Sequence, residues 1–164
     1  MKYLFVLLSL LVLMAGATSQ SVQKWKIGDL ENYIKKSNTP VIINFWATYC
    51  KPCIEEIPYF HKLVKEYEKK GVKLLLVSLD LPEEYPKIRS FATKRKYTAP
   101  IVWLDESNAD YFCPKVDDAW SGAIPASLFI NNKTGYRKFS EDQISKEDLK
   151  KEINSMLSVK KSIP

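Results

Sequence analysis

Two cysteines separated by only two residues stand in the segment "NFWATYCKPCIEEIP", residues 44–58. They are Cys50 and Cys53. On a helix, residues three apart share a face with Cβ atoms about 5–6 Å apart, and a small adjustment brings their sulfurs within disulfide range. The spacing therefore allows a bond that closes and opens without moving the fold.

The two sulfurs are expected to differ in reactivity. Cys50 falls at the tip of a predicted helix, where free N–H groups and the helix dipole stabilise a thiolate, and Lys51 adds a positive charge. Cys53 lies one turn further along and should be more buried. The pattern predicts that Cys50 attacks a substrate disulfide and that Cys53 resolves the mixed disulfide, leaving a redox-active Cys50–Cys53 pair.

Other chemistry fits these residues poorly. Haem attachment would need a histidine directly after the second cysteine, where Ile54 stands. A zinc site needs about four ligands, and Cys50, Cys53, His61 and Cys113 lack finger-like spacing. We therefore expect no metal and no cofactor, and we expect His61 to be a partly buried helix residue. A local disulfide with a purely structural role remains an alternative.

The cysteines need a strand before them and a helix after them. Residues 40–46 form an apolar run of strand length, and residues 50–70 repeat apolar side chains every three or four positions. Further strands are expected at 72–79, 100–104, 126–130 and 136–139, and further helices at 29–37, 82–96 and 145–157. Residues 105–123 are expected to be irregular, with one helical turn at 116–120. This order predicts an α/β fold, a central mixed sheet with helices on both faces.

The N-terminal residues have the features of a targeting segment. Residues 4–17 form an apolar run that is too short to cross a bilayer. The run follows Lys2 and ends in small residues, which predicts a signal peptide at 1–19 with cleavage near 17–20. Residues 20–164 then form a single domain in the periplasm or outside the cell. An uncleaved N-terminal membrane anchor is the alternative.

The charge of the chain indicates no nucleic-acid partner. The formal net charge is +6, but the basic residues are scattered in pairs and triplets and no aromatic-basic motif accompanies them. A solvated basic surface explains the excess of lysine and arginine.

The sequence resembles the thioredoxin superfamily, and within it the TlpA/ResA-like exported thiol-disulfide oxidoreductases. The matching stretches are "FWATYCKPC" at 45–53, Glu56, Pro58 and "GAIPASLFI" at 122–130. The resemblance implies a thioredoxin fold over residues 25–160 and disulfide exchange with protein substrates. It further implies a monomer that acts as a reductant, for example on apocytochrome c, with a membrane-bound electron donor.

The resemblance also implies roles for individual residues. Pro125 matches a cis-proline that lies beside the sulfurs and leaves the backbone of Ile124 free to pair with an extended substrate segment. Asn44 stands where cytoplasmic thioredoxins usually carry a buried aspartate, so Glu56 is the candidate that helps to deprotonate Cys53. The alternative is an exposed first-turn acid. The residues expected to bind substrate are Trp46, Tyr49, Ile124 and Pro125.

Several functions remain open beside this one. The segment 105–122 either shapes substrate choice or is an ordinary insertion, and its Cys113 is a buried structural thiol, a dimer link or a regulatory partner. The chain could instead be a peptide-binding module with incidental redox chemistry, or a disulfide oxidase or isomerase. A peroxidase is less suitable, because the Pro-x-x-x-Thr-x-x-Cys pattern of peroxiredoxins is absent around Cys50.

Overall fold

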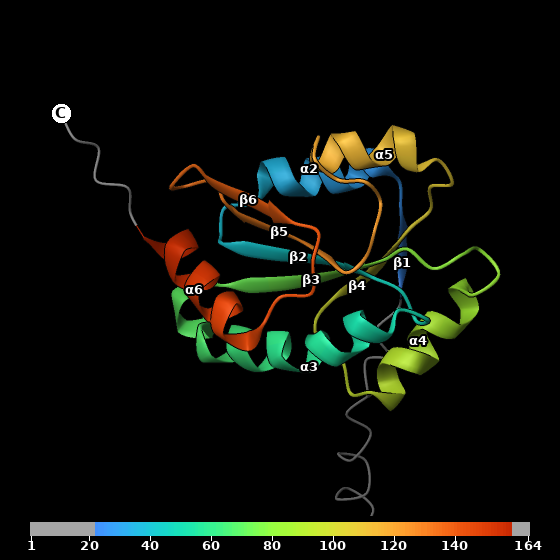
Figure 1. Ribbon diagram of the computed structural model, residues 1–164, viewed down its shortest axis with the longest axis horizontal. Helices are drawn as coiled ribbons and strands as arrows, with labels where there is room; N and C mark the ends of the chain where they lie inside the picture. The colour runs from blue at the N-terminus through green and yellow to red at the C-terminus, as the bar shows by residue number, and fades with distance from the viewer. Residues whose placement is uncertain (1–21, 159–164) are drawn as a thin grey trace, which may run out of the picture.

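The computed structural model describes residues 22–158, so the signal peptide expected at 1–19 lies outside the described residues. Within that range no helix has the length and apolar character needed to span a membrane. The chain forms one six-stranded sheet with helices packed on both sides (Figure 1). The expected α/β class with a central mixed sheet is therefore confirmed.

The strands follow the order β1-β4-β3-β2-β5-β6 across the sheet. They are β1 (Gln23–Trp25), β2 (Val41–Trp46), β3 (Lys73–Ser78), β4 (Ile101–Leu104), β5 (Ala126–Asn131) and β6 (Tyr136–Ser140). Neighbouring strands from β1 to β2 are parallel, whereas β5 runs antiparallel to β2 and β6 antiparallel to β5. The carboxyl end of β2 is thus flanked by the end of β3 and by the start of β5.

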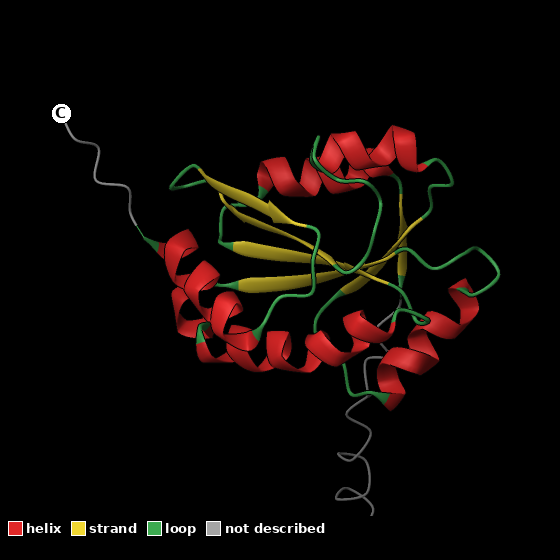
Figure 2. Ribbon diagram, viewed as in Figure 1, coloured by secondary structure: helices red, strands yellow, loops and turns green. Residues whose placement is uncertain are grey.

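Helices cover both faces of the sheet (Figure 2). They are α2 (Ile27–Lys36) and α5 (Ala109–Val116) on one face, and α3 (Lys51–Glu66), α4 (Tyr85–Lys94) and α6 (Lys146–Leu157) on the other. A short 3₁₀ helix, Glu68–Lys70, follows α3 and ends at Gly71, whose φ of +79° is left-handed. Glycine adopts this conformation without steric cost.

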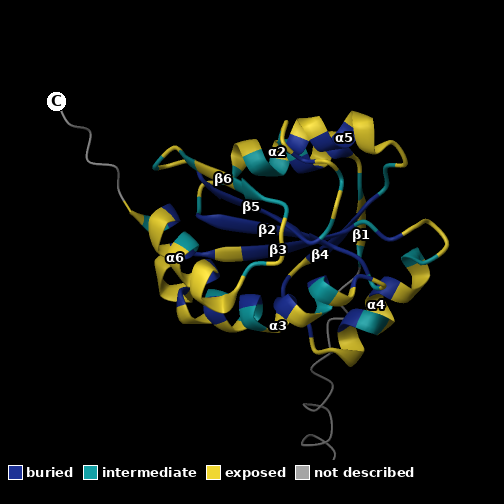
Figure 3. Ribbon diagram, in the orientation of Figure 1, coloured by how far each residue is buried: buried dark blue, intermediate teal, exposed yellow. Residues whose placement is uncertain are grey.

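Strand β2 separates two apolar cores, because successive side chains of a strand point to opposite faces. Ile42 and Trp46 belong to the core beneath α3, α4 and α6. Ile43 and Phe45 belong to the core beneath α2 and α5. Every residue of β2 is buried, as Figure 3 shows for the centre of the sheet.

The structure corrects two expectations about secondary structure. Residues 105–123 contain the two-turn helix α5. The turn expected at 116–120 appears as a single hydrogen-bonded turn, in which the backbone N–H of Trp120 donates to the carbonyl oxygen of Asp117 at 3.0 Å. Pro114 lies inside α5, a position that usually disfavours a helix, and Phe112 and Cys113 are buried. Strand β1 was not predicted, because three residues are too few to show a period.

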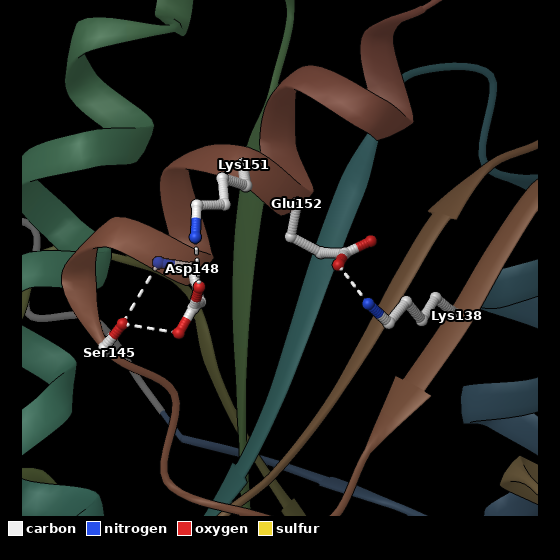
Figure 4. A network of polar contacts seen from close by, with 5 residues as sticks. All are labelled: Lys138, Ser145, Asp148, Lys151 and Glu152. Atoms are coloured by element: carbon white, nitrogen blue, oxygen red, sulfur yellow. Dashed lines mark hydrogen bonds and ion pairs between the residues drawn. The ribbon is translucent and has the colours of Figure 1, made fainter.

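The C-terminal helix begins where the sequence predicts. The Ser145 side chain accepts a hydrogen bond from the backbone N–H of Asp148 at 3.1 Å, which caps α6. An ion pair between Lys138 of β6 and Glu152 of α6 ties the helix to the sheet edge (Figure 4). The cap fixes the C-terminal end of the short connector between β6 and α6, residues 141–145, and the ion pair holds α6 against β6.

Candidate active site

The two cysteines are joined in a disulfide at the start of α3. Cys50 is the N-cap residue, and its Sγ accepts a hydrogen bond from the backbone N–H of Cys53 at 3.3 Å. Cys50 keeps 7% of its surface exposed, whereas Cys53 has none. The sulfur of Cys50 therefore lies at the positive end of the helix dipole and is the one nearer to solvent, which is the position that favours a thiolate.

A buried carboxylate holds the residues that precede Cys50. Asp80 lies just beyond the end of β3, and its Oδ1 accepts a hydrogen bond from the backbone N–H of Thr48 at 2.9 Å. Its Oδ2 accepts one from the Ser78 hydroxyl at 2.7 Å. The indole N–H of Trp103 donates to the carbonyl oxygen of Asp80 at 2.7 Å. Asp80 was not predicted from the sequence, although an acid shortly after a buried strand lies at the edge of the sheet where functional residues are usual.

Glu56 is fully buried, so the alternative of an exposed first-turn acid is wrong. Its Oε1 accepts a hydrogen bond from Asn44 Nδ2 at 2.7 Å, and its Oε2 accepts one from the backbone N–H of Ile144 at 3.1 Å. The amide of Asn44 also donates to the Ser127 hydroxyl at 3.1 Å. Asn44 therefore orients Glu56 from the strand position where an aspartate would otherwise stand.

Burial raises the pKa of Glu56 to about 7, and the hydrogen bonds from Asn44 and Ile144 offset only part of this rise. A carboxyl group with a pKa near neutrality can take up or release a proton under ordinary conditions. Glu56 lies one turn beyond Cys53 on the same helix. The burial and the raised pKa are consistent with a proton acceptor, and the role of Glu56 in deprotonating Cys53 stays a prediction.

The residues expected to bind substrate occupy different depths. The Tyr49 side chain, directly before Cys50, is 64% exposed, and Ile124 is half-buried. The peptide bond between Ile124 and Pro125 is cis, as the resemblance implied. Trp46 has no exposed surface, and its ring packs at 5.7 Å from the ring of Tyr97. Trp46 therefore supports the site from the core, and the exposed aromatic side chain beside Cys50 is Tyr49.

The segment between β4 and β5 buries Phe112 and Trp120, whereas its Tyr111 is exposed. The ring of Trp120 lies 4.4 Å from that of Phe45, and its indole N–H donates to the carbonyl oxygen of Ala123 at 2.9 Å. Cys113 is free and buried, and burial followed by the nearby carboxylates Glu141 and Asp110 raises its pKa to about 11. A buried, protonated thiol fits a structural role.

The remaining candidate, His61, is half-buried on α3 with its ring 5.5 Å from that of Tyr97. Burial lowers its pKa. Within residues 22–158, no three histidine, cysteine or acidic side chains gather closely enough to hold a metal ion.

Comparison with known proteins identifies a matching family and relatives of this chain. Residues 15–135 match the AhpC/TSA family. The thiol-disulfide oxidoreductase ResA of Geobacillus thermodenitrificans is 32% identical over 117 residues, which cover 71% of this chain and 62% of the relative. The ResA of Oceanobacillus iheyensis is 55% identical over 91 residues, which cover 55% of this chain and 43% of the relative. The chain thus spans less than two thirds of the length of these curated relatives.

A solved structure shares the fold. The thiol:disulfide interchange protein of the thioredoxin family from Chlorobium tepidum superposes with a TM-score of 0.62 at 19% identity, covering 77% of this chain and 85% of that one. At this identity the similarity establishes the fold alone, and it confirms the thioredoxin fold expected from the sequence.

Proposed function

Because the chain belongs to the AhpC/TSA family, we propose that it is a thiol-disulfide oxidoreductase that exchanges its Cys50–Cys53 dithiol with disulfides of protein substrates. The observation that carries this proposal is the geometry of the pair. Cys50 caps the helix, and the buried Cys53 precedes by three residues on the same helix Glu56, whose pKa burial raises to about 7. The curated names of the ResA relatives support the same activity.

The reduction of a substrate follows in two steps. The Cys50 thiolate attacks one sulfur of the substrate disulfide, so a mixed disulfide forms and the other substrate sulfur leaves as a thiolate. Cys53 then loses its proton to Glu56 and attacks the Sγ of Cys50. The second substrate sulfur leaves, and the two electrons that the substrate gained correspond to the new Cys50–Cys53 bond. A separate donor must return two electrons to this bond before the next cycle.

We further propose that the protein works outside the cytoplasm as a reductant, in a role of the cytochrome c maturation type, with a membrane-bound electron donor. The signal-peptide pattern at 1–19 supports export. In an oxidising compartment a reductant needs electrons from elsewhere, which is why a membrane donor belongs to the proposal.

A trapping experiment tests the exchange chemistry. The variant Cys53→Ser keeps the attacking sulfur but cannot resolve a mixed disulfide, so it should accumulate covalent complexes that dithiothreitol releases. The matched control Cys50→Ser should accumulate almost none, because Cys53 is buried. Equal capture by both variants of partners that dithiothreitol does not release would point to non-covalent peptide binding and would remove the proposed activity. The reduction potential of the Cys50–Cys53 pair, measured against glutathione, then decides between reductant and oxidase.

A further inference from the structure

The carboxylate of Glu141 accepts hydrogen bonds from the backbone just before Ile124. Oε1 of Glu141 accepts hydrogen bonds from the backbone N–H groups of Ser121 at 3.0 Å and Ala123 at 2.9 Å, and from the Ser121 hydroxyl. Glu141 is the first residue after β6. These hydrogen bonds, that of the Ser121 hydroxyl foremost, hold the pKa of Glu141 below its ordinary value, so the carboxylate stays charged at neutral pH.

The backbone conformation of residues 121–123 allows one oxygen to accept both of these backbone hydrogen bonds. Gly122 has a φ of +98°, and a Cβ atom at this position would lie 3.6 Å from Cys113 Sγ on α5. The left-handed turn brings the two flanking N–H groups to the same oxygen, much as backbone N–H groups form an anion-binding nest. The indole N–H of Trp120 also donates a hydrogen bond to the carbonyl oxygen of Ala123. The segment is therefore fixed at consecutive residues.

Fixing this segment also fixes Ile124. Within residues 22–158, the backbone N–H and C=O of Ile124 make no hydrogen bond to another residue. The paired part of β5 begins at Ala126, opposite Phe45. Ile124 thus lies between two anchors, the Glu141 contact and the β5 ladder, with its own backbone groups available. A pre-ordered pair of backbone groups binds an extended chain with a smaller entropy loss than a mobile pair does.

The connector that carries Glu141 also touches the redox helix. The backbone N–H of Ile144 is the group that donates to Glu56, and the side-chain amide of Gln143 donates to the carbonyl oxygen of Pro52 at 3.2 Å. The connector therefore contacts both the Ile124 segment and the helix that bears the sulfurs. Glu141 provides the contact on the side of Ile124.

We propose that Glu141 is a positioning residue for protein substrates: acting through Ser121 and Ala123, it holds the backbone of Ile124 ready to pair with the extended segment that flanks a substrate disulfide. This inference rests on the proposed function, and it deepens that function by separating two substrate classes. A protein disulfide needs the Ile124 backbone, whereas a small aromatic disulfide reaches the Cys50 sulfur without it.

The test compares these two substrate classes in the full-length chain. Dithiothreitol is the electron source for the protein substrate, whereas the small disulfide is mixed with pre-reduced protein from which dithiothreitol has been removed, because dithiothreitol reduces small aromatic disulfides directly. The substrates are insulin and 5,5′-dithiobis(2-nitrobenzoate). Glu141→Ala should lower kcat/KM for insulin about tenfold or more, chiefly through a higher KM, and should change the rate with the small disulfide by less than about twofold. Glu141→Gln should lie between, because its amide oxygen still accepts hydrogen bonds but lacks the charge.

Asp142→Asn is the matched control. It removes the same charge from the adjacent residue, whose exposed side chain makes no hydrogen bond or ion pair among the described residues. This control should behave as the wild type with both substrates.

Three results would overturn the inference: both rates falling together in Glu141→Gln, neither rate changing in Glu141→Ala, or the same selective loss in Asp142→Asn. A wild-type chain that reduces neither substrate would instead refute the proposed function itself.

Discussion

Replacing Glu56 by glutamine should change how the stability of the protein depends on pH. The folded protein raises the pKa of Glu56 from 4.5 to about 7, mainly because the carboxyl group is buried. The unfolded chain releases this proton near its ordinary pKa. Between pH 4.5 and pH 7 the folded state therefore binds more protons at this site than the unfolded state does, so the stability falls as the pH rises.

The size of the effect follows from the shift. A difference of one pKa unit corresponds to about 1.4 kcal/mol, so the rise from 4.5 to about 7 corresponds to an order of 3 kcal/mol. Below pH 4.5 both states hold the proton and the penalty is absent. Above pH 7 both states are ionised and the full penalty remains. Glutamine does not titrate and should abolish this contribution.

Glutamine also carries a constant cost that does not depend on pH. Its amide oxygen can still accept the hydrogen bond from Asn44, but its NH₂ group cannot accept the one from the N–H of Ile144. Leaving that partly buried N–H unpaired costs about 1–3 kcal/mol. The variant should therefore be less stable than the wild type at pH 4.5 and should gain on it as the pH rises to 7.5.

Urea unfolding of the disulfide form at pH 4.5, 5.5, 6.5 and 7.5 measures this difference. Glu55→Gln is the control, because Glu55 precedes Glu56 on the same helix and its side chain is 56% exposed. The difference in unfolding free energy between Glu56→Gln and the wild type should change by about 3 kcal/mol across the range, and that of the control should stay constant. A difference that stays flat for Glu56→Gln would refute the raised pKa and the role of Glu56 as proton acceptor.

Two further predictions concern buried groups around the site. Asp80→Ala should lower the free energy of unfolding by about 1–3 kcal/mol, because the N–H of Thr48 loses its acceptor. Urea unfolding measures this change. An unchanged midpoint would contradict a stabilising role for the hydrogen bond between Thr48 and Asp80. Iodoacetamide at pH 8 should label Cys113 of the native, reduced protein far more slowly than Cys50, because Cys113 is buried with a pKa of about 11. Peptide mass spectrometry follows both sites, and equal labelling rates would contradict the difference.

Local sequence patterns were sufficient to predict the strand and the helix that position the two cysteines. The apolar run that became β2 and the helix that follows it were evident from periodicity, because burial on both faces and a 3.6-residue repeat leave a direct trace in the sequence. The spacing of Cys50 and Cys53 at this junction identified the pair that forms the disulfide. The resemblance supplied the cis peptide bond before Pro125. Helix α5 was not predicted because Pro114 interrupts its helical pattern, and strand β1 was not predicted because it has only three residues.

The contacts that tune the site came only from the tertiary structure. Asn44 meets Ser127 across 83 residues of sequence, Glu56 meets Ile144 across 88, and Thr48 meets Asp80 across 32. No local period records such partners, because they meet only when separate strands align at one edge of the sheet. Composition and spacing determined which atoms could react. Folding decided that Glu56 and Trp46 are buried, and that Glu141 accepts hydrogen bonds from the backbone of Ser121 and Ala123, because burial and hydrogen-bond partners depend on the packing of distant segments.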